Sequence, residues 1–82
     1  DARTGRIKGG PTRVGKNPRD LALAGDGAWV TLNAAGEAVR LSADGKVTKR
    51  VKVGRLPYGV AVGADRCWVA ALGDDRVVAI TL

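Results

Sequence analysis

The chain has 82 residues, a formal net charge of +6 and 45% hydrophobic residues, which leaves room for one small domain with a modest core. Cys67 is the only cysteine and there is no histidine, so a disulfide framework and a Cys/His zinc site are excluded. No apolar run approaches the roughly 20 residues of a membrane-spanning helix, and no stretch has the order of a secretory signal. We therefore expect a soluble protein without a membrane partner.

The first half of the chain has the pattern of short strands separated by turns. Apolar residues of alternating size, then β-branched and aromatic residues, favour extended structure, and Asp44-Gly45 is a strong hairpin signal. Polar residues dominate the segment after that hairpin, as expected of an exposed sheet edge. Four strands are predicted here, at 20–24, 28–32, 38–41 and 46–52.

The second half repeats the first at an offset of 39 residues. Aligning 14–43 with 53–82 without gaps gives 30 pairs, of which eight are identical. Chance similarity would not keep turn residues and apolar positions in register together, so strands are also predicted at 59–63, 67–71 and 77–80. The identical pairs are Val14/Val53, Gly15/Gly54, Pro18/Pro57, Ala22/Ala61, Asp26/Asp65, Trp29/Trp68, Val30/Val69 and Val39/Val78.

The second repeat has no fourth strand, because the sequence ends at Leu82. The segment 1–7, read as a continuation of Ile80-Thr81-Leu82, supplies a turn and a new strand. We therefore expect the outer strand of the last repeat to stand at the front of the chain, around Arg6, Ile7 and Lys8. This order, together with the absence of methionine, leads us to expect an engineered or excised fragment.

The stretches VGKNPRDLALAGDGAWVTLN and VGRLPYGVAVGADRCWVAALGDDRVVAI resemble β-propeller repeats of the YVTN/NHL type, including those of virginiamycin B lyase-like propellers. The resemblance covers nearly the whole chain. It implies an all-β fold with two four-stranded antiparallel blades per chain, arranged radially in a ring of four to eight blades. Residues 14–52 would form blade one and 53–82 the three strands of blade two.

Two blades cannot close a ring, and their unpartnered faces would expose apolar surface at a cost comparable with the stability of a small domain. The resemblance therefore implies homo-oligomerisation, with residues 1–13 closing the last blade of a neighbouring subunit by a head-to-tail contact. A homotrimer would have six blades and a homotetramer eight. The residues expected to pack between blades are Trp29, Trp68, Leu21 and Val60.

In such a ring, the segments leading into the first strand of each blade would gather at the mouth of the central channel. A modest basic excess repeated by symmetry focuses a positive potential, so a small anionic ligand is the candidate partner there. Asn33 and the acidic turn Asp74-Asp75 would lie nearby. The residues predicted at this mouth are Lys16, Asn17, Arg19, Arg55 and Tyr58.

Three functions remain open from the sequence. The first is a structural one, self-assembly without catalysis or cofactor. The second is a binding module whose basic channel mouth holds an anionic ligand or nucleic acid, although basic residues on an outer strand favour edge protection over a nucleic-acid footprint. The third, an enzyme, is disfavoured because the lyase-like relatives are expected to use a histidine, which this chain lacks. A monomeric eight-stranded sandwich or barrel is the competing fold.

Overall fold

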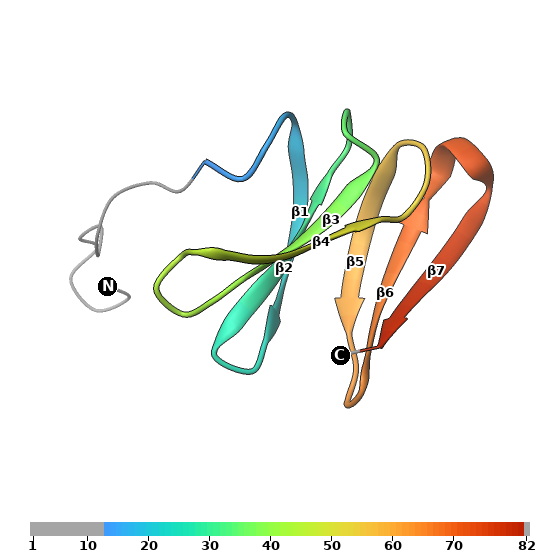
Figure 1. Cartoon of the computed structure of the whole chain (residues 1–82). Helices are drawn as coiled ribbons and strands as arrows, with labels where there is room; N and C mark the ends of the chain where they lie inside the picture. Colours follow the sequence, from blue (N-terminus) through green and yellow to red (C-terminus); the bar gives the residue numbers. More distant parts are fainter. Residues whose placement is uncertain (1–12, 82) are drawn as a thin grey trace.

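Seven short strands make up the part of the chain that the computed structural model describes, residues 13–81 (Figure 1). They are β1 (Pro18–Ala24), β2 (Gly27–Leu32), β3 (Glu37–Leu41), β4 (Val47–Lys52), β5 (Pro57–Val62), β6 (Arg66–Ala71) and β7 (Arg76–Thr81). β1 to β4 form a first antiparallel sheet and β5 to β7 a second. Each strand pairs with the next one along the chain, so both sheets are runs of hairpins.

The all-β prediction and the seven strands predicted between residues 20 and 80 are confirmed, with bounds that differ by at most two residues. A 3₁₀ turn, η1 (Leu72–Asp74), takes the place of the simple turn expected after β6. The described strands form two separate sheets, so the closed barrel is wrong for this part of the chain. The strand predicted around Arg6, Ile7 and Lys8 lies outside the described residues.

The backbone repeats as faithfully as the sequence. Gly15 and Gly54, 39 residues apart, both have positive φ, at 146° and 122°. The next such pair is Asn17 and Leu56, at 60° and 53°. The chain therefore enters the first strand of both sheets with the same backbone conformation. Leucine rarely adopts the left-handed conformation found at Leu56.

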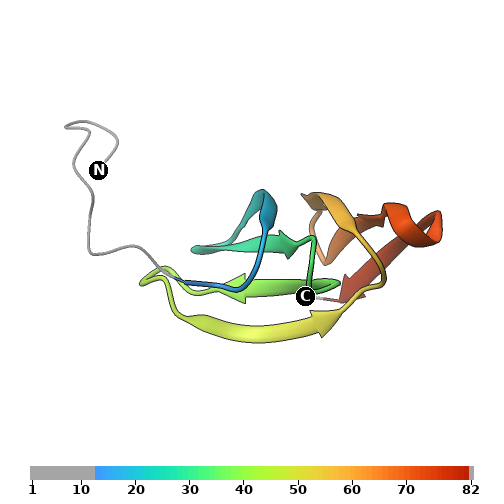
Figure 2. The same ribbon diagram turned by 90° about the horizontal axis from the view of Figure 1, so that it is seen from above.

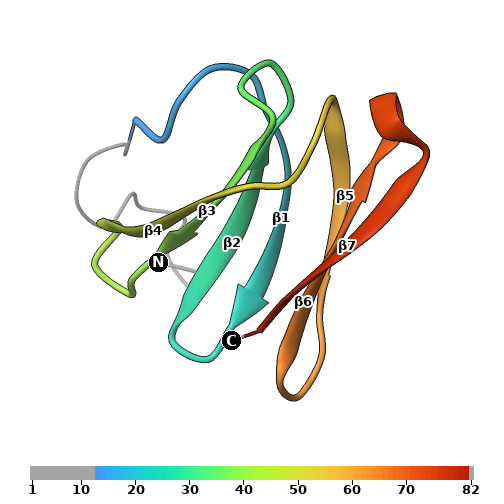
Figure 3. The ribbon, with the colours of Figure 1, turned by 45° about the vertical axis from the view of Figure 1, so that its right-hand side comes forward.

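The two sheets pack face to face, with β1 beside β5 (Figures 1 and 3). Figure 2 shows why: after β4, the connection crosses back so that β5 begins on the side of the molecule where β1 lies. Trp29, which is 1% exposed, and Ala38 from the first sheet meet Cys67, Val69 and Ile80 from the second in one buried cluster. We call this contact the internal interface.

Burial of its ring, rather than a polar contact, holds Trp29 in the internal interface. Its indole Nε1 has no hydrogen-bond partner within the described part of the chain, which costs about 1–3 kcal/mol for a buried donor. Covering the large ring outweighs that cost, since an aromatic side chain buries about 150–250 Å² at about 25 cal/mol per Å². Of the residues predicted to pack between blades, Trp29 lies in this buried cluster and Val60 packs against it.

Side chains alternate between the two faces of a strand, so each sheet has a second, outer face. On the first sheet this face carries Val30 and Val39, which form a smaller buried cluster with Leu32 and Val14. Exposed apolar residues extend it at Leu21 and Leu23, 55% and 77% exposed. We call this surface outer face one; its members are Leu21, Leu23, Val30, Leu32, Val39 and Leu41.

The second sheet also has an apolar outer face. Trp68 is 45% exposed and Val77 is 68% exposed, and strand pairing places Trp68 between Ala61 and Ala79. We call this surface outer face two; its members are Ala61, Trp68, Ala70, Val77 and Ala79. Two of the four residues predicted to pack between blades, Leu21 and Trp68, thus lie on outer faces of the single chain.

Candidate functional site

Two chain segments at one end of the molecule flank an open pocket of about 600 Å³. One is the turn between β2 and β3, and the other is the connection from β4 to β5. The residues lining the pocket are Asn33, Ala34, Ala35, Gly36, Lys52, Gly54, Arg55 and Leu56. This volume lies within the range of about 300–1,000 Å³ typical of small-molecule sites, so we take it as the candidate site.

Hydrogen bonds between the two segments fix the shape of this pocket. The Val53 N–H donates to the Gly36 carbonyl at 3.0 Å, and the Asn33 side-chain Nδ2 donates to the Pro57 carbonyl, also at 3.0 Å. A Cβ at Gly36 would lie 2.8 Å from the Gly54 carbonyl oxygen, so only glycine permits this close approach. The wall of the pocket is therefore set by the backbone.

Arg55 is held by the turn that follows β6. Its backbone N–H and its Nε donate to the two carboxylate oxygens of Asp74 at 2.9 and 2.8 Å, and one terminal nitrogen donates to the Gly73 carbonyl at 2.7 Å. The hydrogen bond from the Arg55 side chain is the main reason why the pKa of Asp74 lies below its ordinary value. Most of the hydrogen-bonding capacity of Arg55 is thus used within the protein.

Of the five residues predicted at a basic channel mouth, only Arg55 lines this pocket. Asn17 adjoins it, because its carbonyl accepts the Asn33 N–H at 3.0 Å. Arg19 stacks over the Tyr58 ring at 5.5 Å from its centroid, a cation–π contact between the first strands of the two sheets. Lys16 is exposed and is not part of the pocket wall.

Sequence reasoning assigned Lys52 to edge protection, whereas the structure places it in the pocket wall. It ends β4 directly before Val53 and Gly54. Its cross-strand neighbour Glu37 pairs with Arg50 instead, at 3.3 Å. The available signal was the position of Lys52, a cation at the end of a strand next to a glycine-containing connection.

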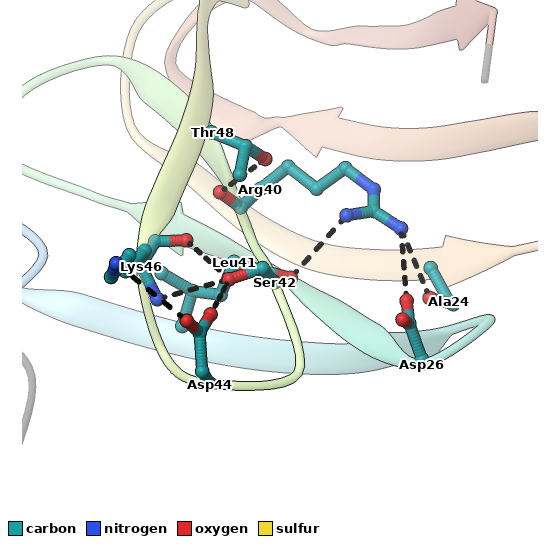
Figure 4. Close-up of polar contacts among 8 residues, drawn as sticks. All are labelled: Ala24, Asp26, Arg40, Leu41, Ser42, Asp44, Lys46 and Thr48. Atoms are coloured by element: carbon teal, nitrogen blue, oxygen red, sulfur yellow. Dashed lines mark hydrogen bonds and ion pairs between the residues drawn. The ribbon is translucent and has the colours of Figure 1, made fainter.

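Arg40 organises the opposite end of the first sheet (Figure 4). Its guanidinium donates to the carbonyls of Ala24 at 3.3 Å and Leu41 at 3.4 Å, and lies 4.0 Å from Asp26. Next to it, the hairpin predicted at Asp44-Gly45 is confirmed (Figure 4). These contacts brace two hairpins, which is a structural task.

The remaining chemistry-bearing groups form no constellation. Cys67 is fully buried, and desolvation raises the pKa of its thiol, which makes it a poor nucleophile. Within residues 13–81 no three histidine, cysteine or carboxylate side chains cluster as metal ligands would. No helix in that range is long and apolar enough to cross a bilayer.

Comparison with protein-family models, with curated proteins and with solved structures found no match to this chain. Its function must therefore be argued from its own surfaces.

Proposed function

We propose that this chain is a self-assembling structural module, in which outer face two of one copy packs on outer face one of the next. The copies would form a closed β-propeller of six blades as a homotrimer or of eight as a homotetramer. The observation that carries the proposal is the equivalence of surfaces. By the 39-residue offset, the face of the first sheet that lies in the internal interface corresponds to outer face two. The face of the second sheet that lies in the internal interface corresponds to outer face one.

The counterparts differ in burial in the way that a missing neighbour predicts. Trp29 is 1% exposed within the internal interface, whereas its counterpart Trp68 is 45% exposed on outer face two. Ala38 is fully buried, whereas its counterpart Val77 is 68% exposed. The same type of surface is thus covered in the first sheet and uncovered in the second, which supports a partner for the second.

Outer face one supplies the complementary surface. Its exposed residues Leu21 and Leu23 correspond to Val60 and Val62, which pack against the core of the internal interface. A patch of this kind on a small protein marks an interaction site or an aggregation hazard. Because the two outer faces differ from each other, their contact is heterologous, and such contacts either close into a ring or continue as a filament.

The second sheet has three strands where the first has four. In the proposal, residues 1–13 of the neighbouring copy, of which 1–12 lie outside the described residues, complete it by pairing with the outer edge of β7. Closure of this edge would remove a row of unpaired backbone groups. A filament would cover the same faces between copies, but it would leave a β7 edge unpaired at one end and the segment 1–13 without a partner at the other.

The two interfaces would differ in polarity. Three hydrogen bonds cross the internal interface in the described part of the chain: the Val60 N–H donates to Asp20 at 3.1 Å, the Thr31 hydroxyl donates to the Tyr58 carbonyl at 2.7 Å, and Asn33 donates to the Pro57 carbonyl. The three side chains that make these hydrogen bonds have no polar counterparts on outer face two or at its rim. The counterparts of Asp20, Thr31 and Asn33 are Gly59, Ala70 and Leu72.

Loss of the Asp20 contact would leave no backbone N–H unpaired at the interface between copies. The Leu21 N–H, counterpart of the Val60 N–H, already donates to Asp20 of its own chain at 2.9 Å. It therefore needs no acceptor from a neighbour. Apart from the strand pairing at β7, the interface between copies would depend on apolar burial to a greater extent than the internal one.

The test is the molar mass in solution, measured by light scattering across a range of protein concentrations. The proposal predicts a species with three or four times the 8.5 kDa mass of one chain, persisting on dilution. A folded monomer at every concentration would contradict it and favour a two-sheet sandwich that tolerates its apolar outer faces.

A further inference from the structure

We propose that the pocket between the β2–β3 turn and the β4–β5 connection binds a small amphipathic anion, namely a carboxylate attached to a short apolar chain. This binding function goes beyond self-assembly and does not depend on it. The β2–β3 turn and the β4–β5 connection, which line the pocket, are held together by hydrogen bonds within one chain. A monomer that retains the internal interface would therefore bind as well as an assembled ring.

The apolar part of the ligand would contact Leu56. This side chain is 51% exposed and lies in the pocket wall with the exposed Ala34 and Ala35. Ala34 and Ala35 belong to the same turn as Gly36, and the hydrogen bond from the Val53 N–H to the Gly36 carbonyl fixes the position of this turn. The three side chains give one side of the pocket an apolar lining that the fold itself leaves uncovered.

Leu56 also has an unfavourable backbone conformation. Its φ of 53° lies in the left-handed region, where a β-carbon comes close to the next carbonyl oxygen. The counterpart Asn17, at φ 60°, is a residue type that adopts this conformation readily. Because Leu56 is half exposed, packing of its side chain offsets little of the free-energy cost of this conformation. Residues kept in such conformations cluster at functional sites.

The anionic group of the ligand would meet Lys52. No ion pair involving this side chain occurs among residues 13–81. Its possible partner Glu37 is engaged by Arg50, and the neighbouring Arg55 is engaged by Asp74. Lys52 is thus the cation in the pocket wall whose charge is available, and a carboxylate is the complementary group.

The occupant follows from this combination. A purely inorganic anion would leave Leu56 and the two alanines in water, whereas a neutral hydrocarbon would leave the Lys52 ammonium without a partner. A carboxylate attached to an apolar chain would contact both walls, and hexanoate, which is much smaller than the pocket, serves as its simplest probe.

The experiment is a titration of the full chain, uniformly labelled with ¹⁵N, with hexanoate, hexanol and inorganic phosphate, followed by amide chemical shifts. We expect hexanoate to shift the amides of Gly36, Gly54 and Leu56 in a saturable manner, with hexanol and phosphate at least about tenfold weaker. Equal binding of phosphate and hexanoate, or no saturable shift with hexanoate at millimolar concentration, would overturn the proposal.

Two variants sharpen the test. Lys52→Gln should weaken hexanoate about tenfold, whereas the control Lys46→Gln, at an exposed lysine outside the pocket wall that pairs with Asp44, should leave its affinity unchanged. Leu56→Asn should weaken hexanoate and, by relieving the backbone, raise the urea midpoint of unfolding. An unchanged affinity in Leu56→Asn, or equal loss in both lysine variants, would refute the assignment. Light scattering on the same samples reports assembly separately, so failure of either proposal is recognisable on its own.

Discussion

Trp29 and Trp68 allow a direct comparison between the internal interface and the proposed interface between copies. They are identical residues at equivalent positions of the repeat, yet only Trp29 is buried in the single chain. We therefore expect Trp29→Ala and Trp68→Ala to act on different equilibria. The first should destabilise the folded chain, and the second should weaken association while the chain stays folded.

The magnitudes follow from exposure. Trp68 is 45% exposed, so of the roughly 150–250 Å² that an aromatic side chain can bury, about 70–110 Å² would be newly covered in the assembly. At about 25 cal/mol per Å² this corresponds to about 2–3 kcal/mol for each interface. Trp68→Ala should then lower each association constant by about 30- to 150-fold, whereas Trp29→Ala should cost about 3–5 kcal/mol in unfolding.

Sedimentation velocity and urea unfolding, performed on the same preparations, separate the two effects. Trp68→Ala should sediment as a monomer at concentrations where the parent chain is assembled, and it should retain the circular dichroism of a β protein. Trp29→Ala should unfold at much lower urea or fail to fold. The reasoning is refuted if Trp68→Ala leaves the assembled mass unchanged on dilution, or if both variants lose the same unfolding free energy at concentrations where neither associates.

Two further predictions concern the fold and its pH dependence. A Cβ at Gly27 would overlap the carbonyl oxygen of Leu41 on the adjacent strand, whereas one at Gly59 would meet open space. Gly27→Ala should therefore lower the urea midpoint of unfolding strongly, and Gly59→Ala should change it little. Equal effects of the two substitutions would contradict the strand register. The pKa of Asp74 is lowered in the folded chain, first by the side-chain hydrogen bond from Arg55, so the stability it contributes is present above the ordinary carboxyl pKa of about 3.9 and is lost as the pH falls through the lowered value. Asp74→Asn should flatten the acid side of the curve of unfolding free energy against pH, and an unchanged curve would show that the ion pair adds no stability.

Strand positions were predictable because they depend on local alternation and turn residues, which the repeat presents twice. Asp44-Gly45 gave the hairpin between β3 and β4 for the same reason. Burial was less predictable: Trp29 and Trp68 are indistinguishable by sequence pattern, and the structure separates them only because one has a neighbouring sheet and the other does not.

The candidate site was only partly predictable. Arg55 was expected near the loops that now form the pocket, but Lys52 was assigned to the exposed edge because the polar alternation of its strand gives no sign that the strand ends at a pocket. The left-handed conformation of Leu56 could not be expected from leucine itself. The counterpart Asn17 is a residue type suited to that conformation. The conformation of Leu56 could have been inferred only by assuming that equivalent positions of the repeat share their backbone geometry.

The absence of counterparts to the Asp20, Thr31 and Asn33 contacts has a consequence for temperature. Apolar association weakens on cooling, and in the proposed ring the face-to-face contact between copies lacks the three hydrogen bonds that span the internal interface, although strand pairing at β7 would add backbone hydrogen bonds. Chilling should therefore weaken the face-to-face contact between copies before it disturbs either sheet, so that the assembly would loosen in the cold and recover on warming. Transfer of the Thr31 contact by Ala70→Thr should make the assembly less sensitive to cold.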